Sequence, residues 1–131
     1  MRKLNRFHVC YIFSMIFILS ACTQKEPIYK QLGLEKDAPH ILFVSNKQNY
    51  LNESVYYDAL IELKNTFPED INQLTVLQFQ KDDEYLKRLN IEESPCLLII
   101  FNDDILVNIS GAVSKEEIIQ PVTKTLSQYQ Q

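Results

Sequence analysis

The apolar residues of this chain fall into runs that predict alternating strands and helices. Continuous apolar runs at 40–45 and 96–101 are typical of strands that are buried on both faces, and the run at 74–79 predicts a further strand. A tight polar turn separates residues 96–101 from the apolar run at 105–109. These last two strands are therefore expected to pair as a hairpin.

Segments with helical spacing connect the strands. A first apolar stripe, with spacings of four, three and four residues, is formed by Tyr56, Leu60, Leu63 and Phe67. Asn52 is expected to cap the start of this helix, and Pro68 is expected to end it. A short helix capped by Asp82 or Asp83 is expected to follow residues 74–79. Each of the two helices thus lies between two predicted strands.

A final helix is predicted near the end of the sequence. Ser114 and Glu117 have the spacing of a capping box, in which each side chain accepts a hydrogen bond from the other residue's backbone N–H. The apolar stripe that follows is formed by Ile119, Val122, Leu126 and Tyr129. The resulting order is βαβαββα, with a right-handed parallel crossover between the first two strands. We therefore expect an α/β domain with a mixed sheet and helices on both faces.

A different pattern occupies the first 22 residues. Three basic residues precede an apolar stretch at 7–19, and the tetrad LSAC ends at Cys22. This arrangement is typical of a secretory signal peptide, and the stretch is short for a membrane span, which needs about 20 residues. The tetrad resembles the lipobox of bacterial lipoproteins, which implies cleavage before Cys22 and a thioether-linked diacylglyceryl lipid on its sulfur. The alternative is an uncleaved anchor with an ordinary cysteine.

This segment sets the expected domain organisation. We expect a signal peptide at 1–21, a lipid-anchored tether at 22–39 and one folded domain at 40–131. An alternative for part of the tether is a short helix or strand, formed by Ile28, Tyr29, Leu32 and Leu34, that docks on the domain. Cleavage would leave 110 residues with 10 basic and 17 acidic side chains, a net charge of −7 instead of −4. Of the three cysteines, only Cys96 would then keep a free thiol. With or without cleavage, the chain is expected outside the cytoplasm, attached to the bacterial cell membrane.

Composition excludes several classes of function. Two glycines are too few for a phosphate-binding glycine loop, and the negative charge argues against nucleic-acid partners, which need clustered Lys and Arg. His40 is the single histidine after the signal segment, so neither a catalytic Ser–His–Asp triad nor a metal site is predicted. No cofactor is expected beyond the covalent lipid on Cys22.

The order of elements, with a proline directly before residues 96–101, resembles the thioredoxin fold. Residues 40–67 match, without gaps, the strand and long helix that carry the thioredoxin active site, and the match resumes at Asn90. There NIEESPCLLII resembles the segment that enters the cis-proline loop, and SGAVSKEEI resembles the glycine and capped start of the final helix. The resemblance covers about 40–128 and implies a thioredoxin-like fold whose first strand and helix are truncated or absent.

The resemblance fails at the residues that carry dithiol exchange. The positions of the thioredoxin CxxC motif are occupied by Tyr50, Leu51, Asn52 and Glu53. The buried acid of thioredoxins corresponds to Val44. Because disulfide exchange needs an attacking thiolate and a resolving thiol, the resemblance implies a member without redox activity. Pro95 corresponds to the cis-proline, whose loop faces bound substrate chains in that family.

We therefore expect a non-redox module that binds a protein or peptide of the cell envelope, or acts as an accessory to one, rather than an enzyme. Its candidate binding surface consists of Tyr50, Leu51, Asn52, Glu53, Ser94, Pro95 and Cys96. One alternative is a monothiol redox or thiol-binding activity through Cys96, although no cationic neighbour in the sequence would lower its pKa and free cysteines are often buried. The other alternative is a structural envelope lipoprotein of the peptidoglycan-associated type.

Overall fold

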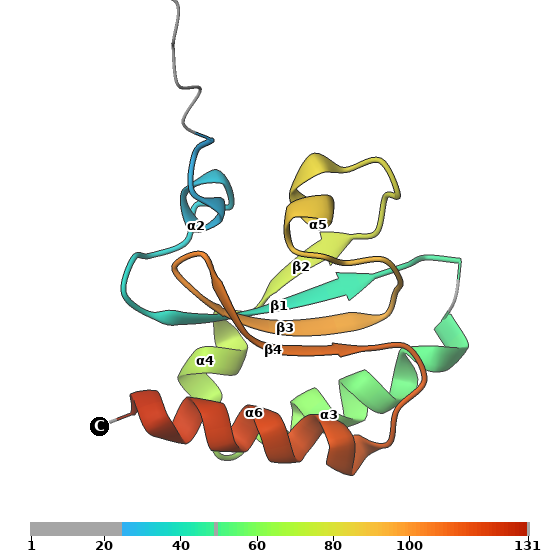
Figure 1. Ribbon diagram of the computed structural model, residues 1–131. Coiled ribbons are helices and arrows are strands. Elements are labelled where there is room, and N and C mark those ends of the chain that lie inside the picture. The colour runs from blue at the N-terminus through green and yellow to red at the C-terminus, as the bar shows by residue number, and fades with distance from the viewer. Residues whose placement is uncertain (1–24, 49, 131) are drawn as a thin grey trace, which may run out of the picture.

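A four-stranded sheet forms the centre of the domain (Figure 1). The computed structural model describes residues 25–48 and 50–130, so the expected signal peptide and Cys22 lie outside the described residues. The strands are β1 (Pro39–Ser45), β2 (Thr75–Gln78), β3 (Cys96–Phe101) and β4 (Asp104–Ser110). Their order is β2-β1-β3-β4; β1 and β2 are parallel and the other neighbours are antiparallel. The predicted parallel crossover and terminal hairpin are both confirmed.

Helices cover both faces of the sheet, as predicted (Figure 1). One side carries α3 (Ser54–Lys64), α4 (Pro68–Asn72) and α6 (Lys115–Tyr129). The other side carries α2 (Ile28–Gln31) and α5 (Glu84–Arg88). A single turn of 3-10 helix, η2 (Tyr50–Asn52), precedes α3. None of the helices in the described part of the chain is long and apolar enough to cross a membrane.

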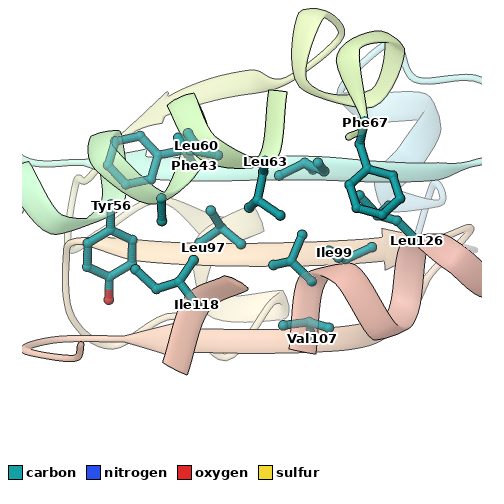
Figure 2. Close-up of a cluster of buried hydrophobic side chains, with 13 residues drawn as sticks. Phe43, Tyr56, Leu60, Leu63, Phe67, Leu97, Ile99, Val107, Ile118 and Leu126 are labelled. Atoms are coloured by element: carbon teal, nitrogen blue, oxygen red, sulfur yellow. The ribbon is translucent and has the colours of Figure 1, made fainter. Parts of the chain in front are cut away.

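The two faces of the sheet contribute to two separate core clusters. Ile41 and Phe43 of β1 pack in the larger cluster with side chains of α3 and α6, and Figure 2 shows this cluster. Leu42 and Val44, which alternate with them, pack in the smaller cluster on the α5 side. Successive side chains of a strand point to opposite faces, so a strand covered on both sides has to be apolar throughout. Each fully buried aliphatic or aromatic side chain contributes about 1.5–3 kcal/mol.

The start of α6 is fixed by the predicted capping box. Ser114 Oγ accepts a hydrogen bond from the Glu117 N–H at 3.3 Å, and Glu117 Oε2 accepts one from the Ser114 N–H at 2.7 Å. Hydrogen bonding of the Glu117 carboxylate to the backbone N–H of Ser114, and secondly to the Ser114 side chain, lowers the pKa of the Glu117 carboxyl, because it favours the charged form. The capping box is thus confirmed.

The start of α3 differs from the prediction. Asn52 belongs to η2, and the residue at the N-cap position is Glu53, whose backbone is already helical and whose side chain makes no capping bond. The prediction for Asn52 was therefore wrong. α3 ends at Lys64, and Pro68 is the first residue of α4, where the missing N–H of a proline leaves no hydrogen bond unmade.

The segment expected to be a tether contains a docked helix. Ile28 of α2 is 4% exposed and packs in the same cluster as Leu42 and Ile100. Its N–H donates to Asp103 Oδ1 at 2.7 Å, so α2 is attached to the turn between β3 and β4. The folded domain therefore begins before His40, the expected boundary, because the apolar side chains of this segment complete the smaller core cluster.

Candidate functional site

Both segments of the candidate binding surface lie at the same end of the sheet. η2 and the start of α3 follow the carboxyl end of β1, and Pro95 directly precedes the amino end of β3. β1 and β3 are antiparallel with Val44 opposite Cys96, so these two strand ends are neighbours. Ser110, at the end of β4, lies opposite Cys96 on the other side of β3. The structure thus brings three chain segments together here.

The loop before β3 is fixed by hydrogen bonds to its neighbours. The peptide bond between Ser94 and Pro95 is cis. The carbonyl of Pro95 accepts a hydrogen bond from the Gly111 N–H at 2.9 Å, and the carbonyl of Gly111 accepts one from the Tyr56 hydroxyl at 2.8 Å. Burial raises the pKa of this hydroxyl far above its usual range, so it remains a donor. The chain of bonds connects the loop to α3, and the Pro95 carbonyl is already engaged within the domain.

Gly111 meets both a conformational and a spatial requirement in this arrangement. Its φ of +76° lies in the left-handed region, which glycine adopts readily and residues with a Cβ atom rarely adopt. A Cβ atom at this position would lie 3.0 Å from Oε1 of Glu93. The same Oε1 accepts a hydrogen bond from the Ser110 hydroxyl at 3.1 Å. Glycine therefore allows the carboxylate of Glu93 to approach the end of β4.

Cys96 is the first residue of β3 and its side chain is 1% exposed. The thiol donates to Asn108 Oδ1 at 3.4 Å. Burial, with a smaller contribution from the negative charge of Glu93, raises the pKa of Cys96 to about 12. At neutral pH this sulfur is a protonated thiol and not a nucleophilic thiolate. The surroundings of Cys96 therefore fit a buried core cysteine and not a reactive monothiol.

Glu53 is a buried acid whose environment the sequence did not indicate. Glu53 is 1% exposed, and its carboxylate accepts hydrogen bonds from three neighbouring residues. The Asn46 N–H donates at 2.7 Å, and the Ser45 hydroxyl lies 3.0 Å from both carboxylate oxygens. The Tyr57 hydroxyl donates to Oε2 at 3.0 Å. Glu53 therefore fastens the start of α3 to the end of β1.

The side chain of Leu51 is 90% exposed, although the residue is large and apolar. It borders a shallow groove of about 310 Å³ between the start of α3 and the connection from β4 to α6. The groove is lined by Leu51, Asn52, Val55, Ala112, Val113, Ser114 and Glu117. None of these described lining residues belongs to the loop at 94–96. The two segments share one end of the sheet, but this groove contains only the first of them.

The described residues offer no cluster that could hold a metal ion. Within 25–48 and 50–130, no group of three or more His, Cys, Asp or Glu side chains is placed for joint coordination. His40 is buried, and its Nε2 forms a hydrogen bond with the Glu35 carbonyl at 2.8 Å. This bond engages one of the two ring nitrogens in the attachment of the N-terminal segment to β1.

Comparison with known proteins gives a relative from Bacillus subtilis and a shared fold. No family model matches the chain. The Pal-related lipoprotein of Bacillus subtilis (strain 168) is 33% identical over 118 residues, which cover 86% of this chain and 90% of that protein. The identity and the coverage of both chains are high enough to indicate a common family.

Solved thioredoxins share the fold at low sequence identity. A thioredoxin-2 described as a component of the protein secretion machinery of the malaria parasite superposes with a TM-score of 0.50 at 14% identity, over 69% of this chain and 85% of that chain. Thioredoxin O2 of Arabidopsis thaliana gives 0.48 at 15% identity, over 72% of this chain and 77% of that chain. The thioredoxin Deadhead of Drosophila melanogaster superposes with a TM-score of 0.49 at 14% sequence identity, over 76% of this chain and 89% of that chain. The thioredoxin-like fold expected from the sequence is confirmed, and these likenesses say nothing about activity.

Proposed function

The chain belongs to the family of the Pal-related lipoprotein of Bacillus subtilis, and from this premise we propose that it is a lipid-anchored envelope protein whose thioredoxin-like domain binds a protein or peptide without redox chemistry. The observation that carries the binding role is the exposure of Leu51 beside a groove. In the resemblance to thioredoxins, Leu51 corresponds to a position within their CxxC motif. An apolar contact would then replace the reactive dithiol at this end of the sheet.

The proposed anchor is a diacylglyceryl lipid on Cys22, attached after removal of residues 1–21. The family relative is named a lipoprotein, and its match covers more of this chain than residues 25–131 contain, so it extends into the N-terminal segment. Two or more acyl chains would hold the protein stably on the membrane, whereas one chain would hold it only marginally. The proposal places the domain outside the cytoplasm, on the bacterial cell membrane.

Labelling of cells with a palmitate analogue tests the anchor. We expect wild type and Cys96→Ala to incorporate the label and to sediment with membranes. Cys22→Ala should lose the label and leave the membrane fraction if the signal peptide is still cleaved. Equal incorporation in Cys22→Ala and wild type would show that the lipid is not on this residue.

The surroundings of Cys96 support the absence of redox chemistry. Cys96 is the one free cysteine among the described residues. It is buried, and its pKa is raised instead of lowered. Catalytic thiols have the opposite environment, with exposure and a cationic or dipolar neighbour that stabilises the thiolate. The alternative of a monothiol activity through Cys96 therefore receives no support from its position.

The binding role depends on apolar contact at Leu51. Single exposed leucines are common on proteins, but Leu51 lines a groove together with the apolar residues Val55 and Val113. A partner that covered Leu51 fully would gain about 1.5–3 kcal/mol from its burial. Such a contribution is of the size expected for a central contact residue in an interface.

Site-specific crosslinking in cells tests this surface. A photoreactive residue at position 51 should give one discrete crosslinked product, and the same residue at Ile61 is the matched control, because Ile61 is also exposed (69%) and does not line the groove. Leu51→Glu should abolish capture of that partner by the anchored protein, whereas Ile61→Glu should not. Equal capture by both variants would contradict the assignment and leave the structural envelope lipoprotein as the better description.

A further inference from the structure

We infer that the face formed by α2 and α5 rests against the lipid headgroups of the membrane, so that α6 and the Leu51 groove face away from it. The inference rests on the proposed lipid at Cys22 and adds the orientation in which the domain is held. Three observations carry it, namely the length of chain before the docked helix, the position of that helix, and the distribution of charge.

The connection between the proposed lipid and the folded domain is short. Lys25 follows Cys22 by three residues, which span at most about 11 Å when fully extended. The chain beyond this point is attached to the domain. The carbonyl of Glu26 and Oε1 of Gln31 accept hydrogen bonds from the Arg88 guanidinium at 2.9 and 3.2 Å, and Ile28 is buried in the core. The α2–α5 face is therefore held close to the bilayer.

The Leu51 groove lies far from this attachment. Ile28 is bonded to Asp103, in the turn after β3, whereas the groove adjoins the opposite end of the sheet. The six residues of β3 separate the two ends by about 20 Å. In addition, α2 and α5 lie on one side of the sheet, and α3 and α6, which border the groove, lie on the other (Figure 1).

Charge favours the same orientation. Residues 25–37 and residues 80–90 each contain three basic and three acidic side chains, so Asp103, which is bonded to α2, gives the α2–α5 face a net charge of about −1. The segments that form α3, α4 and α6, at 54–72 and 115–129, contain six acidic and three basic side chains, a net charge of −3. A bilayer that contains anionic lipids repels the side that carries α3, α4 and α6 more strongly than the α2–α5 face.

Energy transfer from single labelled cysteines tests the orientation on the lipidated full chain in vesicles of phosphatidylethanolamine and phosphatidylglycerol. The acceptor is a fluorophore on the lipid headgroup. The donor is attached to Lys87→Cys on α5, to Lys124→Cys on α6 or to Leu51→Cys, and the buried Cys96 is replaced by alanine in all three. A matched set carries a flexible Gly/Ser insertion after Cys22.

We expect transfer from Lys87→Cys to exceed that from Lys124→Cys and Leu51→Cys by about twofold or more, because α6 and the Leu51 groove lie on the side of the sheet opposite α5, further from the headgroups (Figure 1). The insertion should remove this difference. Equal transfer from the three positions in vesicle-bound protein without the insertion would overturn the orientation alone. A chain that does not float with the vesicles would instead overturn the lipid anchor, and the inference with it.

Discussion

Burial decides the chemistry of Cys96. The thiol lies among aliphatic side chains of the smaller core cluster and donates to Asn108, and its pKa is raised to about 12. Its burial followed from the sequence, because it opens a continuous apolar run. What the run could not show is that Glu93, from the preceding loop, adds a negative charge nearby. Both effects disfavour the thiolate that disulfide exchange would need.

Alkylation kinetics test this environment. The protein used is residues 23–131, in which Cys96 is the single cysteine. We expect Cys96 in the folded protein to be inert towards iodoacetamide below pH 9 and to react fast once urea unfolds the protein. Leu51→Cys in a Cys96→Ala background provides an exposed thiol as control and should react in the folded state. Rapid modification of folded wild type at neutral pH would contradict the burial and restore the monothiol alternative.

The same pKa shift predicts how stability depends on pH. The folded-state pKa of Cys96 lies above its ordinary value of 9.0, so burial of the neutral thiol favours the folded state fully below pH 9. This contribution is lost as the pH rises from about 9 towards 12. Urea unfolding at several pH values should show a steeper alkaline loss of stability in wild type than in Cys96→Ala. Parallel curves would show that the thiol is not protected.

Glu53 is expected to be important for stability although it lies in the candidate binding segment. Glu53→Ala would leave the N–H of Asn46 and the hydroxyls of Ser45 and Tyr57 without this acceptor. An ordinary hydrogen bond contributes about 1 kcal/mol to stability, so for the three donors we expect a total loss of about 3 kcal/mol in urea unfolding followed by circular dichroism. The control Glu62→Ala removes an exposed ion pair with Lys115 and should cost about 0.5 kcal/mol. Similar losses in both variants would contradict the role of Glu53.

The burial of Glu53 could not be predicted from local pattern. An acid near a helix start is typical of a solvated first turn, and Glu53 was expected only as part of the candidate binding surface. The relevant signal was weak. Ser45 and Asn46 lie at the end of an apolar strand, and Tyr57 follows Glu53 by one helical turn. Residues with hydrogen-bond donors therefore precede and follow Glu53 in the sequence. Only the fold of the intervening loop shows that they converge on it.

At the scale of elements, strands were easier to predict than helix starts. β1 and β3 are covered on both faces and are therefore apolar throughout, which makes their bounds visible in the sequence. The start of α6 was visible because a capping box is a local pattern. α3 has no side-chain cap, and its start depends on the hydrogen bonds of Glu53 to β1, which no local pattern encodes.

The capping box allows a test at this scale. Ser114→Ala removes the acceptor of the Glu117 N–H and should lower the free energy of unfolding by about 1 kcal/mol. Ser127→Ala, at an exposed position inside α6, is the matched control and should change stability by less than about 0.5 kcal/mol. Both are measured by urea unfolding. A Ser114→Ala variant as stable as the control would show that the cap does not stabilise α6.

At the scale of the whole molecule, the sequence predicted the two helical layers but not how the N-terminal segment completes one of them. The order of strands and the crossover followed from connection lengths and apolar runs. The docking of α2 depends on contacts across a long sequence separation, between Ile28 and Asp103 and between Gln31 and Arg88. These contacts turn an expected tether into part of the fold and leave a short connection to Cys22.

Replacement of Ile28 tests whether this segment belongs to the folded domain. Ile28→Ala should cost about 2–4 kcal/mol in urea unfolding, because it removes a buried side chain from the smaller core cluster and leaves a cavity. Ile61→Ala removes the same side chain from an exposed position and should cost less than about 0.5 kcal/mol. If both variants are equally stable, residues 25–38 act as a tether after all. The domain would then be free to turn on the membrane, and the difference in energy transfer between α5 and α6 should vanish with it.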